Sequence, residues 1–273
     1  MNYKFILADL DETLLDENKL ISKENLASIN TAAEKGIKFA IASSRSYKTL
    51  EYYKDILNIK PSVICFNGAY SIDENGYVIE NSYLDKDILL KVIQIADEHN
   101  IYYHFYDNDI MFSNRFEYGI HRFYNSNKKL DKKYRIEIRL LPDCRDFIEN
   151  YNVCIHKISL MDNDAEKLQS LREELSSIKK IEFSKSSWNN MEIVKSGINK
   201  GTALKKLSSY LNIPLEACIA IGNDENDIPM IKTAGLGVAV NNSDPIVKQQ
   251  ADYITENDNK HSAIAEVIRK FCL

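Results

Sequence analysis

Two hydrophobic patterns alternate along the first part of the chain. Short, continuous apolar runs, which are typical of buried strands, occur at residues 3–8, 37–42 and 63–66. Between the first two runs, Leu26, Ile29 and Ala33 recur with helical spacing, and Ser22 stands where a helix N-cap is expected. Buried strands that alternate with helices predict parallel βαβ units in which helices cover both faces of one sheet.

The pattern changes near residue 83. A helical pattern at 87–99 is followed by an aromatic-rich, strand-like run at 101–106, and further strands and one helix follow without the βαβ alternation. The alternating pattern returns after residue 195, with apolar runs at 218–221 and 237–240. The sequence therefore predicts an α/β core domain formed by residues 1–82 and 195–273, interrupted by an inserted α+β domain at residues 83–194.

Composition and charge narrow the class of protein. The chain is 44% hydrophobic and 27% charged, as is typical of globular proteins, and its net charge of -5 argues against nucleic-acid binding. No stretch approaches the roughly 18 consecutive apolar residues that a membrane-spanning helix needs, so we expect no membrane association. The five cysteines are widely spaced and form no CxxC pair, which argues against a disulfide framework or a zinc site and favours a reducing, cytoplasmic location.

An acidic pair directly follows the first predicted strand. Side chains alternate along an extended chain, so Asp9 and Asp11 are expected to point the same way, toward the end of the sheet where ligands bind in open α/β folds. Two neighbouring carboxylates require a shared proton or a divalent cation, and Mg²⁺ suits oxygen ligands. Taken alone, the pair is equally typical of acidic residues that cap the next helix.

Three further features lie at the ends of other predicted elements. Ser43 and Ser44 follow the second strand, where hydroxyl and backbone N–H groups form either a phosphate cradle or an ordinary serine cap. Lys200 falls in the first turn of a helix, where a cation is unfavourable unless an anion is near. Residues 222–227 place successive acidic and amide side chains after a buried strand, which suits a hard metal ion. Together these features predict one site at the carboxyl edge of the sheet.

With these segments the chain resembles the haloacid dehalogenase superfamily of phosphatases, specifically the Cof-like branch with a large inserted cap of the C2 type. The resemblance covers essentially the whole chain and is carried by Asp9-Leu10-Asp11-Glu12-Thr13, Ala42-Ser43-Ser44-Arg45, Asn67-Gly68-Ala69, Asn199-Lys200-Gly201 and the segment 222–230. It implies a Rossmann-like parallel sheet with helices on both faces, and a cap at residues 83–194 that closes over the site and supplies substrate contacts.

The resemblance also implies an activity, that of a magnesium-dependent phosphoric monoester hydrolase acting on a small sugar phosphate or phosphorylated cofactor. Asp9 would be the nucleophile that forms an aspartyl-phosphate, and Asp11 would be the general acid and base. The groups implied to hold the phosphoryl oxygens are the backbone of Leu10 and Ser44 and the side chains of Ser43, Lys200 and Asn226. The implied Mg²⁺ ligands are Asp9, the carbonyl of Asp11, Asn223 and Asp227.

Two residues depart from the pattern of the superfamily. Ser44 stands where glycine is usual, and its side chain could crowd the approach to phosphate. Asn223 stands where aspartate is common, and its amide lacks one negative charge, so we expect weaker metal binding. Asp224 or Asp227 could compensate for that charge, directly or through a water.

Two other functions stay open. Related capped proteins with the same aspartate pair are phosphomutases or phosphotransferases, and a decayed scaffold could act as a non-catalytic binding protein. Ser44 and Asn223 are the features that favour the decayed scaffold, whereas the retained acidic, hydroxyl and lysine residues argue against it. The aromatic run at 102–106 is interpreted as packing within the inserted sheet, with a substrate pocket as the alternative. A small phosphate ester is the expected partner, while the particular substrate and the oligomeric state are not predicted.

Overall fold

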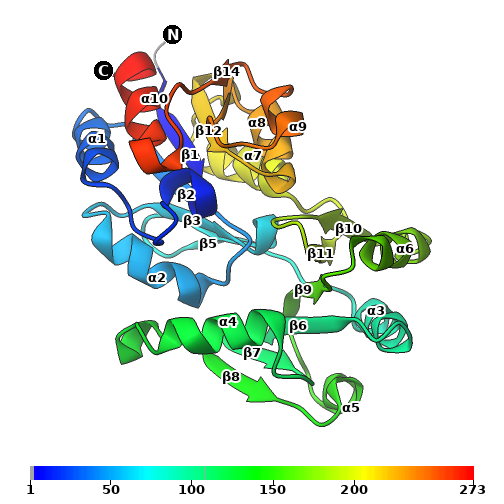
Figure 1. Ribbon diagram of the computed structural model, residues 1–273. Helices are drawn as coiled ribbons and strands as arrows, with labels where there is room; N and C mark the ends of the chain where they lie inside the picture. Colours follow the sequence, from blue (N-terminus) through cyan, green and yellow to red (C-terminus); the bar gives the residue numbers. More distant parts are fainter. Residues whose placement is uncertain (1–2, 108) are drawn as a thin grey trace. The chain divides into compact units, whose positions relative to one another are not determined.

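The structure is a computed structural model that describes residues 3–107 and 109–273 (Figure 1). The chain forms two compact units. The first unit comprises Met1–Ser44, Tyr52–Asn81 and Asn199–Leu273, and the second comprises Arg45–Glu51 and Ser82–Ile198. The predicted fold class, a parallel-sheet α/β core with an inserted α+β domain, is confirmed.

The first unit is built on an eight-stranded sheet with the order β14-β13-β12-β1-β2-β3-β4-β5. Its strands are β1 (Phe5–Asp9), β2 (Lys38–Ala42), β3 (Ser62–Cys65), β4 (Tyr70–Ile72), β5 (Val78–Asn81), β12 (Cys218–Gly222), β13 (Leu236–Ala239) and β14 (Tyr253–Ile254). The strands from β14 to β3 pair in parallel, and β4 and β5 add an antiparallel hairpin at the edge.

Helices cover this sheet because its strands are apolar on both faces. Phe5 and Leu7 of β1 share a buried cluster with Leu204 of helix α7 and Met230 of helix α8. Ile6 and Ala8 of β1 point to the opposite face of the sheet and are also fully buried. The helices α1 and α10 lie side by side although they come from opposite ends of the chain (Figure 1).

The helical elements of the first unit begin and end as follows: η1 (Leu10–Leu14), α1 (Lys23–Glu34), η2 (Phe66–Gly68), α7 (Lys200–Tyr210), η4 (Leu215–Ala217), η5 (Glu225–Asp227), α8 (Ile228–Thr233), α9 (Pro245–Lys248), η6 (Asn259–His261) and α10 (Ala263–Phe271). Helix α2 (Tyr47–Ile56) crosses the division between the units. As predicted, Ser22 caps α1, because its hydroxyl accepts a hydrogen bond from the N–H of Asn25 at 3.0 Å.

The second unit contains a six-stranded sheet with the order β10-β11-β9-β6-β7-β8, antiparallel except for the pair β7 and β8. Its strands are β6 (Tyr102–Asp107), β7 (Ile110–Ser113), β8 (Glu137–Leu140), β9 (Ile155–Met161), β10 (Ile181–Ser184) and β11 (Asn190–Lys195). Its helices are α3 (Lys86–Glu98), α4 (Tyr118–Asn127), η3 (Lys132–Tyr134), α5 (Cys144–Asn150) and α6 (Ala165–Leu175).

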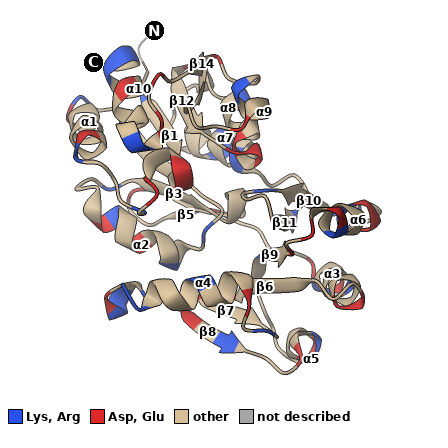
Figure 2. Ribbon diagram, in the orientation of Figure 1, with Lys and Arg blue, Asp and Glu red and all other residues tan. Residues whose placement is uncertain are grey.

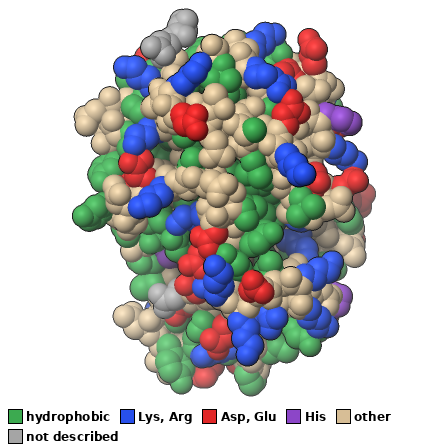
Figure 3. Space-filling model, turned by 90° about the vertical axis from the view of Figure 1, so that its left-hand side faces the viewer, with side chains coloured by type: hydrophobic (Ala, Val, Ile, Leu, Met, Phe, Trp, Pro, Cys, Tyr) green, Lys and Arg blue, Asp and Glu red, His purple; other side chains and the backbone are tan. Residues whose placement is uncertain are grey.

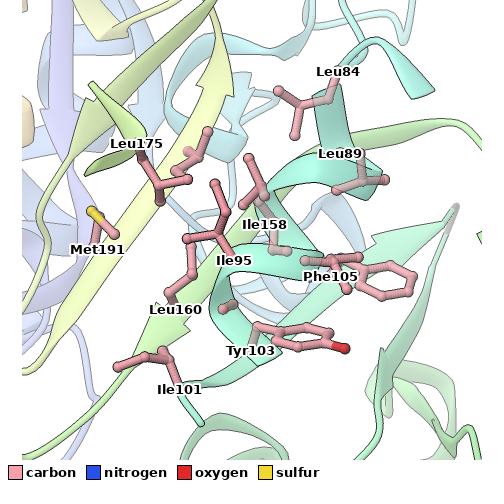
Figure 4. Close-up of a cluster of buried hydrophobic side chains, with 14 of the residues drawn as sticks. Leu84, Leu89, Ile95, Ile101, Tyr103, Phe105, Ile158, Leu160, Leu175 and Met191 are labelled. Carbon is pink, nitrogen blue, oxygen red and sulfur yellow. The ribbon is translucent and has the colours of Figure 1, made fainter. Parts of the chain in front are cut away.

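The aromatic strand β6 packs on both of its faces. Tyr103 and Phe105 belong to a buried cluster with Ile158 of β9, which Figure 4 shows between the sheet and its helices. On the other face, the hydroxyl of Tyr102 accepts a hydrogen bond from the N–H of Ile120 in α4 at 3.0 Å. These contacts support the interpretation that the aromatic run packs the inserted sheet.

Charged residues are mixed in sign over the surface. Figure 2 shows Lys and Arg interspersed with Asp and Glu on the elements of both units, and Figure 3 shows the same mixture on one face of the molecule. Of the helices in the described part of the chain, none combines the length and the apolar character needed to cross a membrane.

The buried cluster of the second unit gives a test of the packing. Ile158 is fully buried in that cluster, so we expect Ile158→Ala to lower the free energy of unfolding by about 2–5 kcal/mol. The matched Ile158→Val change removes one methyl group and should cost about 0.5–1.5 kcal/mol. Urea denaturation of both variants measures the difference, and equal, small losses would contradict the cluster as described.

Candidate active site

The predicted site segments meet at the carboxyl edge of the parallel sheet. Asp9 ends β1 and Gly222 ends β12, and these two strands are hydrogen-bonded neighbours. Ser43 directly follows β2, the neighbour of β1 on its other side. Successive strands run outward from β1 on one side and from β12 on the other, so the strand order reverses between β1 and β12. Ligands in open α/β sheets bind at this reversal.

Two close contacts bring the start of α7 to the same edge. Gly68 has a φ of +110°, and a Cβ atom there would lie 2.6 Å from the carbonyl oxygen of Asn199, so only glycine allows η2 to approach α7 this closely. Asn199 caps the helix by accepting a hydrogen bond from the N–H of Thr202, whose hydroxyl accepts from the N–H of Asn199 in return. These contacts fix the first turn, which carries Lys200.

Lys200 forms a buried ion-pair network at the centre of the site. Its Nζ atom lies 2.6 Å from Oδ1 of Asp9 and 2.6 Å from Oδ1 of Asp227, and the lysine is fully buried. Burial alone would lower the pKa of Lys200, but the carboxylates of Asp227 and Asp9 raise the pKa above its usual value. The ammonium group therefore stays protonated between the two acids. The sequence predicted Lys200 and Asp9 in one site, and the structure places them in contact.

Asp227 is held by the loop that follows β12. Its Oδ2 atom accepts hydrogen bonds from the N–H groups of Asn223 at 2.8 Å and Asp224 at 3.1 Å. Gly222 makes this return possible, because a Cβ atom there would lie 2.6 Å from the same oxygen. Both carboxylate oxygens of Asp227 thus have donors, one from Lys200 and one from the loop. This arrangement makes Asp227 a residue that positions Lys200.

Asp9 is only 6% exposed, which affects its protonation. Burial and the nearby Asp227 raise the pKa of Asp9 to about 8, although Lys200 acts in the opposite direction. With Asp9 ionised, the site holds more negative charge than Lys200 alone balances. A further cation beside Asp9 would favour its ionised form.

The Asn223 amide lies at metal-ligand spacing from the second oxygen of Asp9 and from the carbonyl of Asp11. One terminal atom of the Asn223 amide lies 3.2 Å from Asp9 Oδ2 and 3.0 Å from the carbonyl oxygen of Asp11. Ligands at about 2.0–2.1 Å from an octahedral Mg²⁺ are separated by about 2.8–3.0 Å along an edge. The described residues contain no cluster of three or more His, Cys, Asp or Glu side chains that could hold a metal. A carboxylate, a backbone carbonyl and an amide nevertheless provide the oxygen chemistry that Mg²⁺ requires.

Asp11 lies two residues beyond Asp9, in the turn that follows β1. Its carboxylate is 35% exposed and lies 2.9 Å from Nζ of Lys19. It is also near enough to Asp9 to contribute to the raised pKa of that carboxyl. The orientation of Asp9 and Asp11 toward the same side stays a prediction. The strand ends at Asp9, and the following residues form the helical turn η1, in which Glu12 adopts a left-handed conformation with a φ of +60°. It is the carbonyl of Asp11 that approaches Asn223.

The remaining predicted residues lie around the same edge. Ser43 is almost fully buried, and its carbonyl accepts a hydrogen bond from the N–H of Asn67 at 3.1 Å. The side chain of Asn226 donates to Oδ1 of Asn67, also at 3.1 Å. Leu10 is fully buried after β1, and Ser44 is half-buried after Ser43.

Two residues of the site had no role in the sequence prediction. Thr13 is fully buried and its hydroxyl lies 2.9 Å from the Asn223 amide, while Asn67 contacts both Ser43 and Asn226. Both belong to segments that carry the family resemblance, and their membership in those segments is the sequence feature that could have placed them in the site. Neither has a charged group that would have drawn attention by its chemistry.

Comparisons with known proteins identify the class. The haloacid dehalogenase-like hydrolase family matches residues 6–268, so the chain belongs to that family. A 5-amino-6-(5-phospho-D-ribitylamino)uracil phosphatase of Bacillus subtilis, YcsE, is 31% identical over 100% of this chain and 97% of its own length. The pyridoxal phosphate phosphatase YbhA of Escherichia coli is 26% identical over 98% of each chain.

Solved structures agree with this assignment. A haloacid dehalogenase-like hydrolase from B. subtilis has a TM-score of 0.87 and 25% identity, with 97% of this chain and 99% of the other covered. Another, from Bacteroides thetaiotaomicron, has a TM-score of 0.82 and 27% identity over 98% of this chain and 99% of its own. The comparisons confirm the predicted superfamily and the predicted class of enzyme, a phosphoric monoester hydrolase.

The lysine network gives a test of the site geometry. Lys200→Met leaves two buried carboxylates without their cation, so we expect the free energy of unfolding to fall by about 3–5 kcal/mol. The control Lys205→Met, at an exposed position of the same helix, should stay within about 0.5 kcal/mol of the wild type. Denaturant unfolding compares the two variants. A loss for Lys200→Met as small as that of the control would contradict the buried network.

Proposed function

We propose that this chain is a magnesium-dependent phosphatase that hydrolyses a small phosphorylated metabolite through an aspartyl-phosphate on Asp9. The observation that carries the proposal is the unequal surroundings of the two carboxylate oxygens of Asp9. Oδ1 lies 2.6 Å from the ammonium of Lys200, and Oδ2 lies among the oxygen ligands of Asn223 and Asp11. One end of the carboxylate thus adjoins a cation suited to a phosphoryl group, and the other adjoins a set of oxygens suited to Mg²⁺.

The metal ligands in this proposal are Asp9, the carbonyl of Asp11 and Asn223. When bound, Mg²⁺ supplies positive charge that neutralises the phosphoryl oxygens and Asp9. Asp227 was predicted as a fourth ligand, but we assign it the task of holding Lys200, because both of its oxygens already have donors. Positioning and charge neutralisation are the main demands of phosphoryl transfer.

The chemistry assigned to this chain proceeds in two displacements. In the first, a carboxylate oxygen of Asp9 forms a bond to phosphorus while the ester P–O bond breaks, and Asp11 donates a proton to the leaving oxygen. In the second, Asp11 takes a proton from water as the water oxygen bonds to phosphorus, and the bond to Asp9 breaks. Asp11 must release Lys19, its ion-pair partner at 2.9 Å, to reach the leaving group.

The groups proposed to hold the phosphoryl oxygens come from several segments at the edge of the sheet where Asp9 lies. They are the ammonium of Lys200, the hydroxyl of Ser43, the amide of Asn226 and the backbone N–H groups of Leu10 and Ser44. Lys200 and Asn226 come from the second half of the chain, whereas the other three come from its first 44 residues. Binding phosphate would therefore connect the separate segments of the first unit.

The class of substrate follows from the relatives. YcsE is named for a phosphorylated ribitylaminouracil and YbhA for pyridoxal phosphate, both of them small phosphate monoesters attached to a heterocycle. We propose a phosphorylated cofactor, cofactor precursor or sugar phosphate as the substrate of this chain.

The test is phosphate release from a panel of such esters, with Mg²⁺ and with a chelator. We expect turnover with Mg²⁺ only, and Asp9→Asn should reduce it by at least about 10³-fold because the nucleophile is lost. The control Asp87→Asn makes the same chemical change at an exposed position of α3 and should retain turnover.

Other outcomes would replace the proposal. Phosphorylation of an added sugar with little free phosphate would indicate a phosphotransferase. The absence of turnover on every ester, with or without Mg²⁺, would instead favour a binding protein on the same scaffold.

A further inference from the structure

The Asn223 amide has a position that suits two opposite orientations. One of its terminal atoms faces three polar atoms, at 2.9 Å from Thr13 Oγ1, 3.0 Å from the carbonyl oxygen of Asp11 and 3.2 Å from Asp9 Oδ2. All three are oxygens: the Asp11 carbonyl and the ionised Asp9 carboxylate only accept hydrogen bonds, whereas the Thr13 hydroxyl can also donate. The identity of the amide atom at this position therefore decides whether the contacts attract or repel.

We infer that the Asn223 amide is a cation-dependent switch, in which its NH₂ group is turned toward Asp9 and the Asp11 carbonyl when no cation is bound, and its oxygen takes the same position as a ligand when one is. The inference rests on the proposed function, because it uses the same Mg²⁺ site. It concerns Asn223, which stands where aspartate is common in the superfamily.

The orientation with NH₂ toward Asp9 is favourable without a cation. In this orientation the NH₂ group lies within hydrogen-bond distance of the carbonyl of Asp11, the carboxylate of Asp9 and the hydroxyl of Thr13, so the amide donates to groups that can accept. Asn223 is 9% exposed and Asp9 is 6% exposed, so little solvent is available to replace these donors. Without a metal ion, the NH₂ group thereby stabilises these acceptor oxygens by hydrogen bonding.

When Asp9 is ionised, the orientation with the oxygen toward it requires a cation. The Asn223 oxygen then lies 3.2 Å from Asp9 Oδ2 and 3.0 Å from the Asp11 carbonyl oxygen, and neither contact has a hydrogen between its atoms. Such spacing is favourable only when a positive ion is coordinated by all three oxygens. Rotation of the amide by half a turn exchanges the two arrangements with no change of backbone.

Thr13 is suited to both orientations. A hydroxyl group can donate and accept, so Thr13 can accept from the NH₂ group in one state and donate to the amide oxygen in the other, at the same 2.9 Å. Its side chain is fully buried, so no water replaces it. Thr13 is therefore a positioning residue that orients the Asn223 ligand.

The switch predicts a specific difference from an aspartate at this position. In Asn223→Asp, a carboxylate replaces the donor group beside Asp9 and Asp11, so the metal-free protein should melt at a lower temperature than wild type. The added charge should tighten Mg²⁺ binding by about tenfold or more. Bound Mg²⁺ should consequently raise the melting temperature more in the variant than in wild type.

Calorimetric titration with Mg²⁺ and thermal unfolding, in chelator and in saturating Mg²⁺, measure both effects. Asn25→Asp is the matched control, because Asn25 is also buried but uses its side-chain oxygen to accept from the N–H of Ala265, away from the site. Its Mg²⁺ affinity, and the rise in its melting temperature on adding Mg²⁺, should equal those of wild type.

Thr13 provides the second arm of the test. Thr13→Val removes the hydroxyl and should weaken Mg²⁺ binding by about tenfold, whereas Thr13→Ser should restore it. In ¹⁵N-labelled protein, the Asn223 side-chain NH₂ resonance, assigned by its loss in Asn223→Asp, should shift on adding Mg²⁺. The corresponding resonance of Asn25 should not shift.

The outcomes separate the inference from the proposed function. If neither wild type nor Asn223→Asp binds Mg²⁺, the metal site and the proposed function fail together. If both bind Mg²⁺ with equal affinity, and their metal-free melting temperatures agree, the site stands and the amide switch is wrong.

Discussion

The buried contact of Lys200 with Asp9 and Asp227 is the interaction on which the site depends. Burying an ammonium and two carboxylates away from water costs free energy. Such a network is stable only where the surrounding backbone fixes its geometry. That geometry comes from three separate places in the chain: the end of β1, the first turn of α7 and the loop after β12. The close approaches at Gly68 and Gly222 allow these places to meet. Residues that are distant in sequence are therefore locked into one edge of the sheet.

The same interaction explains why the site calls for a further cation. With all three groups ionised, one positive charge faces two negative charges, and burial together with the Asp227 carboxylate raises the pKa of Asp9. A phosphatase of the proposed type needs Asp9 as an anion. A cation at its second oxygen would stabilise both the folded protein and the ionised nucleophile. Asn223 and Thr13 lie beside that oxygen, which is why the departure from aspartate at position 223 has consequences for both.

The fold was largely predictable from the sequence, whereas parts of the site were not. Alternating buried runs predicted the parallel core, because strand and helix periods are local properties. Helix α4 was not predicted, since its stability comes from contacts such as that of Ile120 with Tyr102. The strand ends that meet at the site followed from the same alternation, but the ion pair of Asp11 with Lys19 did not, because it joins residues across the turn that follows β1. The backbone partners of Asp227 are local, since Asp224 and Asp227 form a capping box, but no local pattern encodes its contact with Lys200.

The most direct test of the account is to trap the covalent intermediate on Asp9. Protein incubated briefly with a turned-over ester and Mg²⁺, then treated with borohydride, should carry a reduced side chain at position 9, identified by mass spectrometry of the peptide that contains residues 5–14. This modification is expected in wild type and should be absent in Asp9→Asn. Turnover without any modification at Asp9, or modification at another acidic residue, would contradict the central role given to this carboxylate.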